Sequence, residues 1–142
     1  MSFKTAIQSD WKTTPMPERH EDVGLRHPFT DEQMSLICRG LIPEEMEDKW
    51  FIYFEDDRLF FHRSWTGMCV FVVHFEKNGD GWMANRVQVN AEPDEYGDPD
   101  LGRDVPMVVY MIRVLLLGED LEFSFEGFVE MWQVMGRGGF GG

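Results

Sequence analysis

Two arginines and a histidine lie among tryptophans in the aromatic middle of this chain. The candidate binding residues are Trp50, Arg63, Trp65, His74 and Arg86. Guanidinium groups hold carboxylates and phosphates through paired hydrogen bonds, and indole rings stack on flat groups. If these side chains share one surface, they predict a site for an anionic small molecule or for the anionic group of a protein partner.

The stretch FHRSWTG, residues 61–67, also carries a histidine and a serine two positions apart. On a strand, His62 and Ser64 point to the same side, as a nucleophile and its base must. The chain contains no G-x-S-x-G turn to expose such a serine, and its cysteines and histidines do not have zinc-site spacing. We therefore assign no catalytic residue, no metal and no cofactor, and we expect His62 to be a hydrogen-bonded core residue.

Charge excludes several classes of partner. The 142 residues include 26 acids against 13 lysines and arginines, which gives a net charge of −13. This charge repels phosphate backbones and argues against nucleic acids and anionic membranes as partners. Many of the acids fall in two segments, 44–57 and 92–104, which we expect to be solvated loops. Contact of these loops with a basic protein is the alternative interpretation.

Length and cysteine content indicate a single domain, residues 1–142, in a reducing compartment. A chain of this length can bury a core without a metal or a disulfide. Cys38 and Cys69 fit no disulfide framework, so we expect two free thiols. The first residues lack the apolar segment of a signal peptide, and no apolar run approaches about 18 residues. We expect a cytoplasmic protein without membrane contact.

The N-terminal third predicts an arm followed by a helix. Residues 1–29 mix proline, histidine and charge without a clear period, which predicts an extended arm that lies over the domain or stays mobile. Thr30 and Gln33 have the spacing of a capping box, and Gly40 can end a helix in the left-handed conformation. A short helix is expected from about 31 to 39.

Four strand-like runs follow between residues 49 and 90. Aromatic and β-branched residues alternate with a period of two, and the runs are separated by Asp56-Asp57, by Thr66-Gly67 and by residues 77–81. This pattern predicts a four-stranded antiparallel β-meander, packed with N-terminal and C-terminal helices in an α+β fold. Two-residue turns would place Phe51 opposite His62, and Trp65 opposite Met68.

The C-terminal third predicts two helices and a tail. Asp104 and Pro106 suit the start of a helix, and Gly118 suits its end. This helix is apolar nearly all round, so we expect it to be buried. A stripe of apolar residues over 125–135 predicts an amphipathic helix, and residues 136–142 predict a flexible glycine-rich tail.

The predicted pairing divides the sheet into two faces. The face that we expect to be core carries Phe51, Tyr53, Phe60, His62, Ser64, Cys69, Phe71, Val73 and Phe75. The opposite face carries Trp50, Ile52, Phe54, Leu59, Phe61, Arg63, Trp65, Met68, Val70, Val72 and His74, with Trp82, Arg86 and Gln88 beside them. This second face is too apolar to face water. Either a helix or the arm covers it, with Arg63 stacked on Trp50, or it is a concave contact site.

The run KWFIYFEDDRLFFHRSWTGMCVF, residues 49–71, resembles a group of small bacterial proteins. The shared features are a K-W-F-x-Y segment, an acidic turn and the F-H-R-S-W-T-G stretch, which together cover about one sixth of this chain. The resemblance implies a bacterial intracellular setting, and no activity comes with it.

Two functions from different classes remain. The first is a small acidic intracellular binding module without its own catalytic centre, which contacts a partner or an anionic small ligand through the aromatic and arginine face. The alternative is an enzyme or accessory domain acting on a phosphorylated or nucleotide-like small molecule. In that case Arg63 and Arg86 would clamp the anion, and His62 or His74 would serve as acid or base. A homodimer formed through the apolar face is a further possibility.

Overall fold

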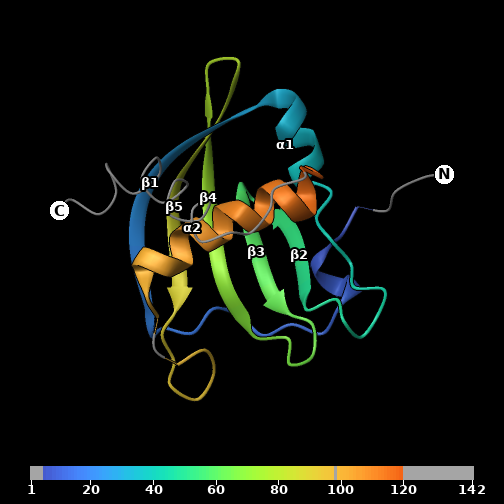
Figure 1. The fold of residues 1–142 in the computed structure, drawn as a ribbon, viewed down its shortest axis with the longest axis vertical. Helices are drawn as coiled ribbons and strands as arrows, with labels where there is room; N and C mark the ends of the chain where they lie inside the picture. The colour runs from blue at the N-terminus through green and yellow to red at the C-terminus, as the bar shows by residue number, and fades with distance from the viewer. Residues whose placement is uncertain (1–4, 98, 120–142) are drawn as a thin grey trace.

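A computed structural model describes residues 5–97 and 99–119. These residues form an α+β fold with one antiparallel sheet of five strands and two α-helices (Figure 1). The strands are β1 (His20–Thr30), β2 (Trp50–Glu55), β3 (Arg58–Arg63), β4 (Cys69–Asn78) and β5 (Gly81–Asn90). The helices are α1 (Asp31–Ile37) and α2 (Leu101–Met111), with a 3-10 turn η1 (Gln8–Asp10) and a π-helical turn η2 (Ile112–Leu116) that continues α2.

The sheet has one more strand than the predicted meander. Its order is β1-β5-β4-β3-β2, so the four predicted strands are neighbours and β1 adds to the free edge of β5. β1 comes from the segment that we expected to be an extended arm. Gly24 and Pro28 interrupt its alternating pattern, and a proline is tolerated there because β1 is an edge strand.

The predicted start of the first helix is confirmed. The amide of Gln33 donates to Thr30 Oγ1 at 3.0 Å, and the amide of Thr30 donates to Gln33 Oε1 at 2.9 Å. The second helix begins at Leu101 rather than near Asp104, because the carboxylate of Asp104 reaches back and accepts from the amide of Asp100 at 2.9 Å. The amphipathic helix predicted over 125–135 and the tail predicted over 136–142 lie outside the described residues.

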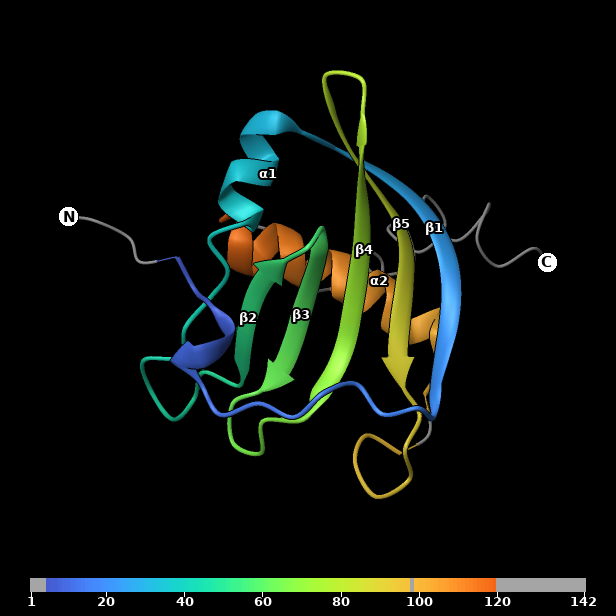
Figure 2. The ribbon, with the colours of Figure 1, turned by 180° about the vertical axis from the view of Figure 1, so that it is seen from behind.

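The two faces of the sheet differ in cover. α2 crosses one face (Figure 1), and the main core lies between them. Seen from behind, the other face carries the N-terminal segment, residues 5–19, along one end, and no other element of the described residues crosses it (Figure 2). We call this second surface the open face.

The predicted division of the sheet is right for β2 with β3 and wrong for β3 with β4. Phe51 pairs with His62 around the Asp56-Asp57 turn, as expected. The next connection takes five residues, 64–68, rather than two, and a bulge shifts the register so that Phe61 pairs with Phe71 and His62 with Cys69. A one-residue slip exchanges the two sides of a strand.

The core therefore combines side chains that we placed on opposite faces. On the sheet, the buried side chains under α2 include Ile52, Leu59, Phe61, Phe71, Val73 and Val87, and α2 contributes Val105 and Val108. The expected core face on β2 and β3, with Phe51, Tyr53 and His62, belongs instead to the open face. There Phe51 and Tyr53 form a smaller cluster with Ala6, beneath the N-terminal segment.

Candidate functional site

The structure does not gather the five predicted site residues on one surface. Arg63 pairs with Trp50, and its guanidinium lies 4.7 Å from the centre of the Trp50 ring on the core side of the sheet. Trp65 follows in the loop between β3 and β4. His74 and Arg86 pair with each other on the open face. Arg63 and Arg86 therefore cannot clamp one anion together, as the enzyme hypothesis requires.

Arg63 and Trp65 line a hollow of about 350 Å³ at the β3–β4 loop. We call it the Trp65 hollow, and its residues are Met46, Lys49, Arg63, Trp65, Thr66 and Met68. The side chains of Trp65 and Met46 are both 75% exposed. The indole Nε1 of Trp65 donates to the carbonyl of Met46 at 3.1 Å, which ties the exposed ring to a second residue of the hollow.

Two cations beside this indole lack an acidic partner. Among residues 5–97 and 99–119, neither Lys49 nor Arg63 forms an ion pair. The nearby carboxylate of Asp48 accepts instead from the amides of Glu44 and Glu45, at 3.0 and 3.1 Å. The Trp65 hollow therefore offers positive charge and an aromatic surface, which together suit an anion attached to a flat or apolar group.

The loop that carries Trp65 is tied to the N-terminal segment through Gly67. The carbonyl of Gly67 accepts from the amide of Thr14 at 2.9 Å and from Nδ1 of His62 at 2.9 Å. A side chain at position 67 would meet the carbonyl of Lys12, because a Cβ there would lie 2.4 Å from it, and the φ of 79° also favours glycine. The FHRSWTG stretch is thus the end of β3 and the start of the loop that docks the N-terminal segment.

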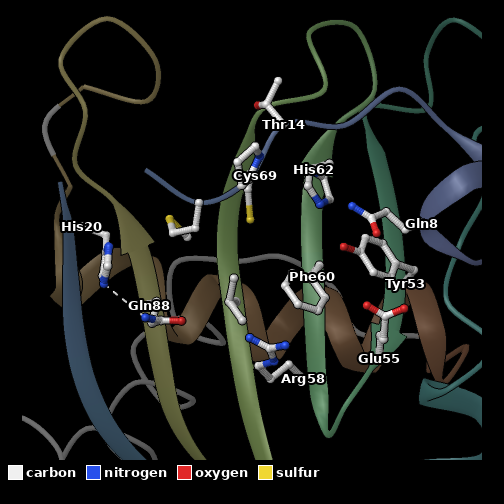
Figure 3. Close-up of a pocket in the computed structure, with 13 residues that line it drawn as sticks. Gln8, Thr14, His20, Tyr53, Glu55, Arg58, Phe60, His62, Cys69 and Gln88 are labelled. Atoms are coloured by element: carbon white, nitrogen blue, oxygen red, sulfur yellow. Dashed lines mark hydrogen bonds between the residues drawn. The ribbon is translucent and has the colours of Figure 1, made fainter. Parts of the chain in front are cut away.

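A second cavity, of about 410 Å³, lies on the open face under the N-terminal segment (Figure 3). We call it the sheet-face pocket. Its lining residues are Gln8, Thr14, Pro15, Met16, His20, Tyr53, Glu55, Arg58, Phe60, His62, Cys69, Val72 and Gln88. The sequence did not predict this pocket, because the side chains of β2 and β3 on this side of the sheet were expected to form the core. The alternation of Arg58, Phe60 and His62 along β3 was the one signal of a mixed surface.

Aromatic rings form the floor of the sheet-face pocket. The rings of Tyr53 and Phe60 stack with centroids 4.7 Å apart and planes within 10°, and the Tyr53 and His62 rings are 5.6 Å apart and within 13°. The guanidinium of Arg58 lies 5.2 Å from the centre of the Phe60 ring, toward the charged end of the pocket. Burial raises the pKa of Tyr53 to about 12, so this floor is uncharged.

His62 leaves one ring nitrogen without a hydrogen bond. Nδ1 faces a carbonyl, which only accepts, so Nδ1 carries the proton and donates to Gly67. Burial lowers the pKa of His62, and the neutral ring then has a lone pair on Nε2. This nitrogen is buried and has no partner among the described residues. Leaving a buried acceptor without a hydrogen bond costs about 1–3 kcal/mol. A ligand that donates a hydrogen bond to Nε2 would remove this cost.

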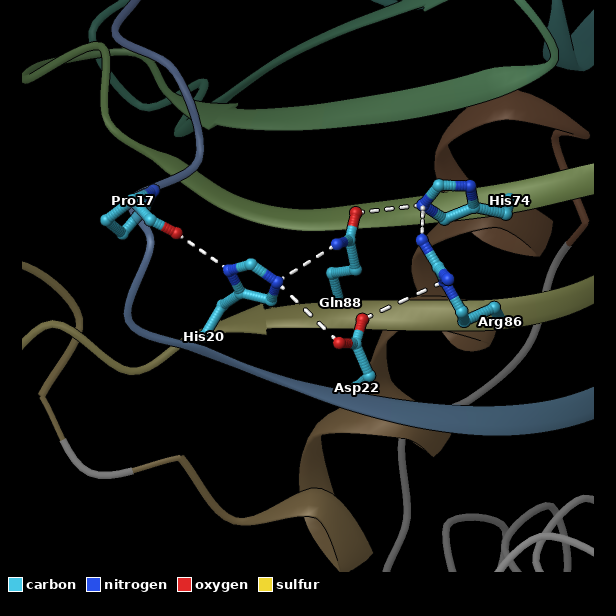
Figure 4. A network of polar contacts seen from close by, with 6 residues as sticks. All are labelled: Pro17, His20, Asp22, His74, Arg86 and Gln88. Carbon is cyan, nitrogen blue, oxygen red and sulfur yellow. Dashed lines mark hydrogen bonds and ion pairs between the residues drawn. The ribbon is translucent and has the colours of Figure 1, made fainter.

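A polar network borders the pocket at β1 and β5 (Figure 4). Nδ1 of His20 donates to the carbonyl of Pro17 at 2.7 Å, and Nε2 of His20 lies 3.1 Å from the amide nitrogen of Gln88. The oxygen of Gln88 then accepts from Nε2 of His74 at 2.8 Å. Nε2 of His74 also lies 3.2 Å from Arg86, and one nitrogen cannot donate to Gln88 and accept from Arg86 at once. His74 is thus engaged in this network and lies apart from Arg63.

Neither cavity contains an assembled metal site. Within the described ranges, no three side chains of histidine, cysteine, aspartate or glutamate are grouped to hold a metal ion. In the same part of the chain, no helix is long and apolar enough to cross a membrane.

The chain was compared with protein families, curated proteins and solved structures. No family model, no curated protein and no solved structure matches it.

Proposed function

We propose that this protein is a binding module without its own catalytic centre, and that the Trp65 hollow recognises an anionic group carried by its partner. The observation that carries the proposal is the pair of cations, Lys49 and Arg63, that lack ion pairs beside an exposed indole within the described ranges. Hydrogen bonds from such cations to a carboxylate or phosphate contribute about 1.5–3 kcal/mol each.

The net charge of the chain restricts the kind of anion. At −13, the protein repels an approaching polyanion over distances set by the ionic strength. Attraction must come from contact within the hollow, where Lys49, Arg63 and the face of Trp65 act together. A single carboxylate or phosphate next to an aromatic or apolar group, as in an acidic peptide or a phosphorylated aromatic side chain, fits this requirement.

Titration with a phosphotyrosine peptide and with a phenylalanine–aspartate peptide tests the proposal. Binding should shift the NMR signal of the Trp65 indole N–H, because that group lies at the hollow. The variants Lys49→Gln and Arg63→Gln should each weaken binding by about tenfold, since each removes a charge-assisted contact.

The matched control is Arg86→Gln, which removes an exposed arginine from the open face. It should leave the affinity unchanged. If neither peptide shifts the Trp65 signal at millimolar concentration, or if all three variants lose affinity equally, the Trp65 hollow is not a site for anions.

A further inference from the structure

The sheet-face pocket points to a second binding site, for a different class of ligand. It shares no lining residue with the Trp65 hollow. We propose that it binds a small uncharged planar heteroaromatic molecule, the size of a nucleobase or an indole, through an N–H group that donates to Nε2 of His62.

His62 supplies the specific contact. Its side chain is 2% exposed, its Nδ1 is held by the carbonyl of Gly67, and its Nε2 has no partner among the residues that the structure describes. The hydrogen bond to Gly67 fixes both the tautomer and the orientation of the ring. Nε2 can therefore accept a hydrogen bond and cannot donate one, which selects a ligand with an N–H or O–H group.

The surrounding rings favour a flat ligand. Tyr53, Phe60 and His62 lie nearly parallel along the floor (Figure 3). Cys69 and Val72 add apolar surface to the lining. A flat ring that meets His62 in this pocket gains aromatic contacts as well as the hydrogen bond.

The charges that line the pocket do not favour a charged ligand. Glu55 and Arg58 carry opposite signs and both line the pocket, so neither an anion nor a cation gains a net attraction from the pair. A neutral imidazole offers no compensating charge to an ion at the His62 end, and burying an ion among these rings has a high desolvation cost. An uncharged ligand fits the pocket best.

Access to His62 requires a small movement of the N-terminal segment. Nε2 is covered in this structure, and Figure 3 shows the side chain of Gln8 beside His62 and Tyr53. Gln8 is exposed, and its side chain makes no hydrogen bond among the residues described. Displacing it therefore breaks no hydrogen bond within this part of the folded chain.

Pairs of probes that differ only in N-methylation test the proposal. The pairs are uracil with 1,3-dimethyluracil, theophylline with caffeine, and indole with 1-methylindole, titrated into protein labelled with ¹⁵N in its histidines. In at least one pair, the N–H member should bind tenfold or more tightly and should shift Nε2 of His62 while Nδ1 stays bonded to Gly67. No binding by any pair at millimolar concentration, equal affinity within every pair, or shifts confined to other histidines would overturn the proposal.

Variants at the rim provide a test that leaves the buried residues intact. Gln8→Trp should fill the mouth of the pocket and lower the affinity for the N–H probe at least tenfold, whereas Gln8→Ala should keep it. Lys49→Gln, which damages the Trp65 hollow, should leave this affinity unchanged. Unchanged binding in Gln8→Trp, or loss of binding in Lys49→Gln, would show that the probe binds elsewhere.

Discussion

Partial burial of His27 and full burial of His62 oppose the charged form of each ring and lower the pKa of both histidines. Burial is the main cause that lowers the pKa of His27 to about 4, with a further contribution from the charge of Arg113, while Glu119 acts in the opposite direction. Nη1 of Arg113 lies 3.1 Å from Nε2 of His27, and because a guanidinium only donates, the ring accepts there. Nε2 of His27 therefore has a donor, whereas Nε2 of His62 has no partner among the described residues.

The lowered pKa of His27 predicts a loss of stability in weak acid. The unfolded chain binds a proton at the ordinary pKa of 6.5 and the folded protein only near 4, so the unfolded state holds more protons between these values. The contribution is fully present above pH 6.5 and is lost as the pH falls toward 4.

A His27→Gln variant isolates this contribution. When the pH is lowered from 7.5 to 5.0, the free energy of unfolding should fall in both proteins. The fall should be smaller in the variant, by roughly 1–2 kcal/mol. Urea denaturation at the two pH values measures the difference, and titrations of carboxylates common to both proteins cancel. An identical pH dependence in the two proteins would contradict the assignment.

At the scale of the elements, the N-terminal segment covers one end of the open face and forms one wall of the sheet-face pocket. Nε1 of Trp11 donates to the carbonyl of Ser64 at 2.8 Å, and its ring stacks on Phe51 with centroids 6.0 Å apart. The amide of Ala6 donates to the carbonyl of Arg39 at 2.8 Å. These contacts join residues that lie far apart in the chain, so neighbouring residues alone do not predict them.

Trp11 should be the main anchor of this segment. We expect Trp11→Ala to lower the free energy of unfolding by about 2–3 kcal/mol. This is at or below the low end of the range measured for truncating fully buried tryptophans, because Trp11 is only half-buried. Amides of residues 5–17 should also exchange faster with solvent.

Trp65→Ala is the matched control. It removes the same type of side chain from an exposed position, and the free energy of unfolding should change by less than about 0.5 kcal/mol. Equal destabilisation by the two substitutions would show that the N-terminal segment is not held by Trp11.

At the scale of the whole molecule, a net charge of −13 opposes folding, because like charges are closer together in the folded state. Salt should therefore stabilise the protein. We expect the free energy of unfolding in urea to rise when NaCl is increased from about 10 to about 200 mM.

The exposed acids of residues 44–47 provide the comparison. Replacing Glu44, Glu45 and Glu47 by glutamine should reduce the dependence on salt, because three like charges are removed. A dependence that is unchanged in this variant would mean that repulsion among these acids does not limit stability.

Neighbouring residues were sufficient to predict several elements. The capping box at Thr30 and Gln33, the left-handed glycine at position 40 and the hairpin around Asp56-Asp57 each depend on a few adjacent residues. The four central strands also follow from their period of two. The sequence therefore determined an α+β fold with an antiparallel sheet. Ligand contact by Arg63 and Trp65 stays a prediction.

Only the tertiary structure decided which face of the sheet is covered. A five-residue connection and a bulge at Phe61 and His62 reversed the sides of β4 relative to β3, which separated Arg63 from His74 and Arg86. The pairing of β1 with β5 and the course of the N-terminal segment are contacts between distant parts of the chain. Because these contacts form the walls of the sheet-face pocket, the pocket and the unpaired nitrogen of His62 become visible only in the folded molecule.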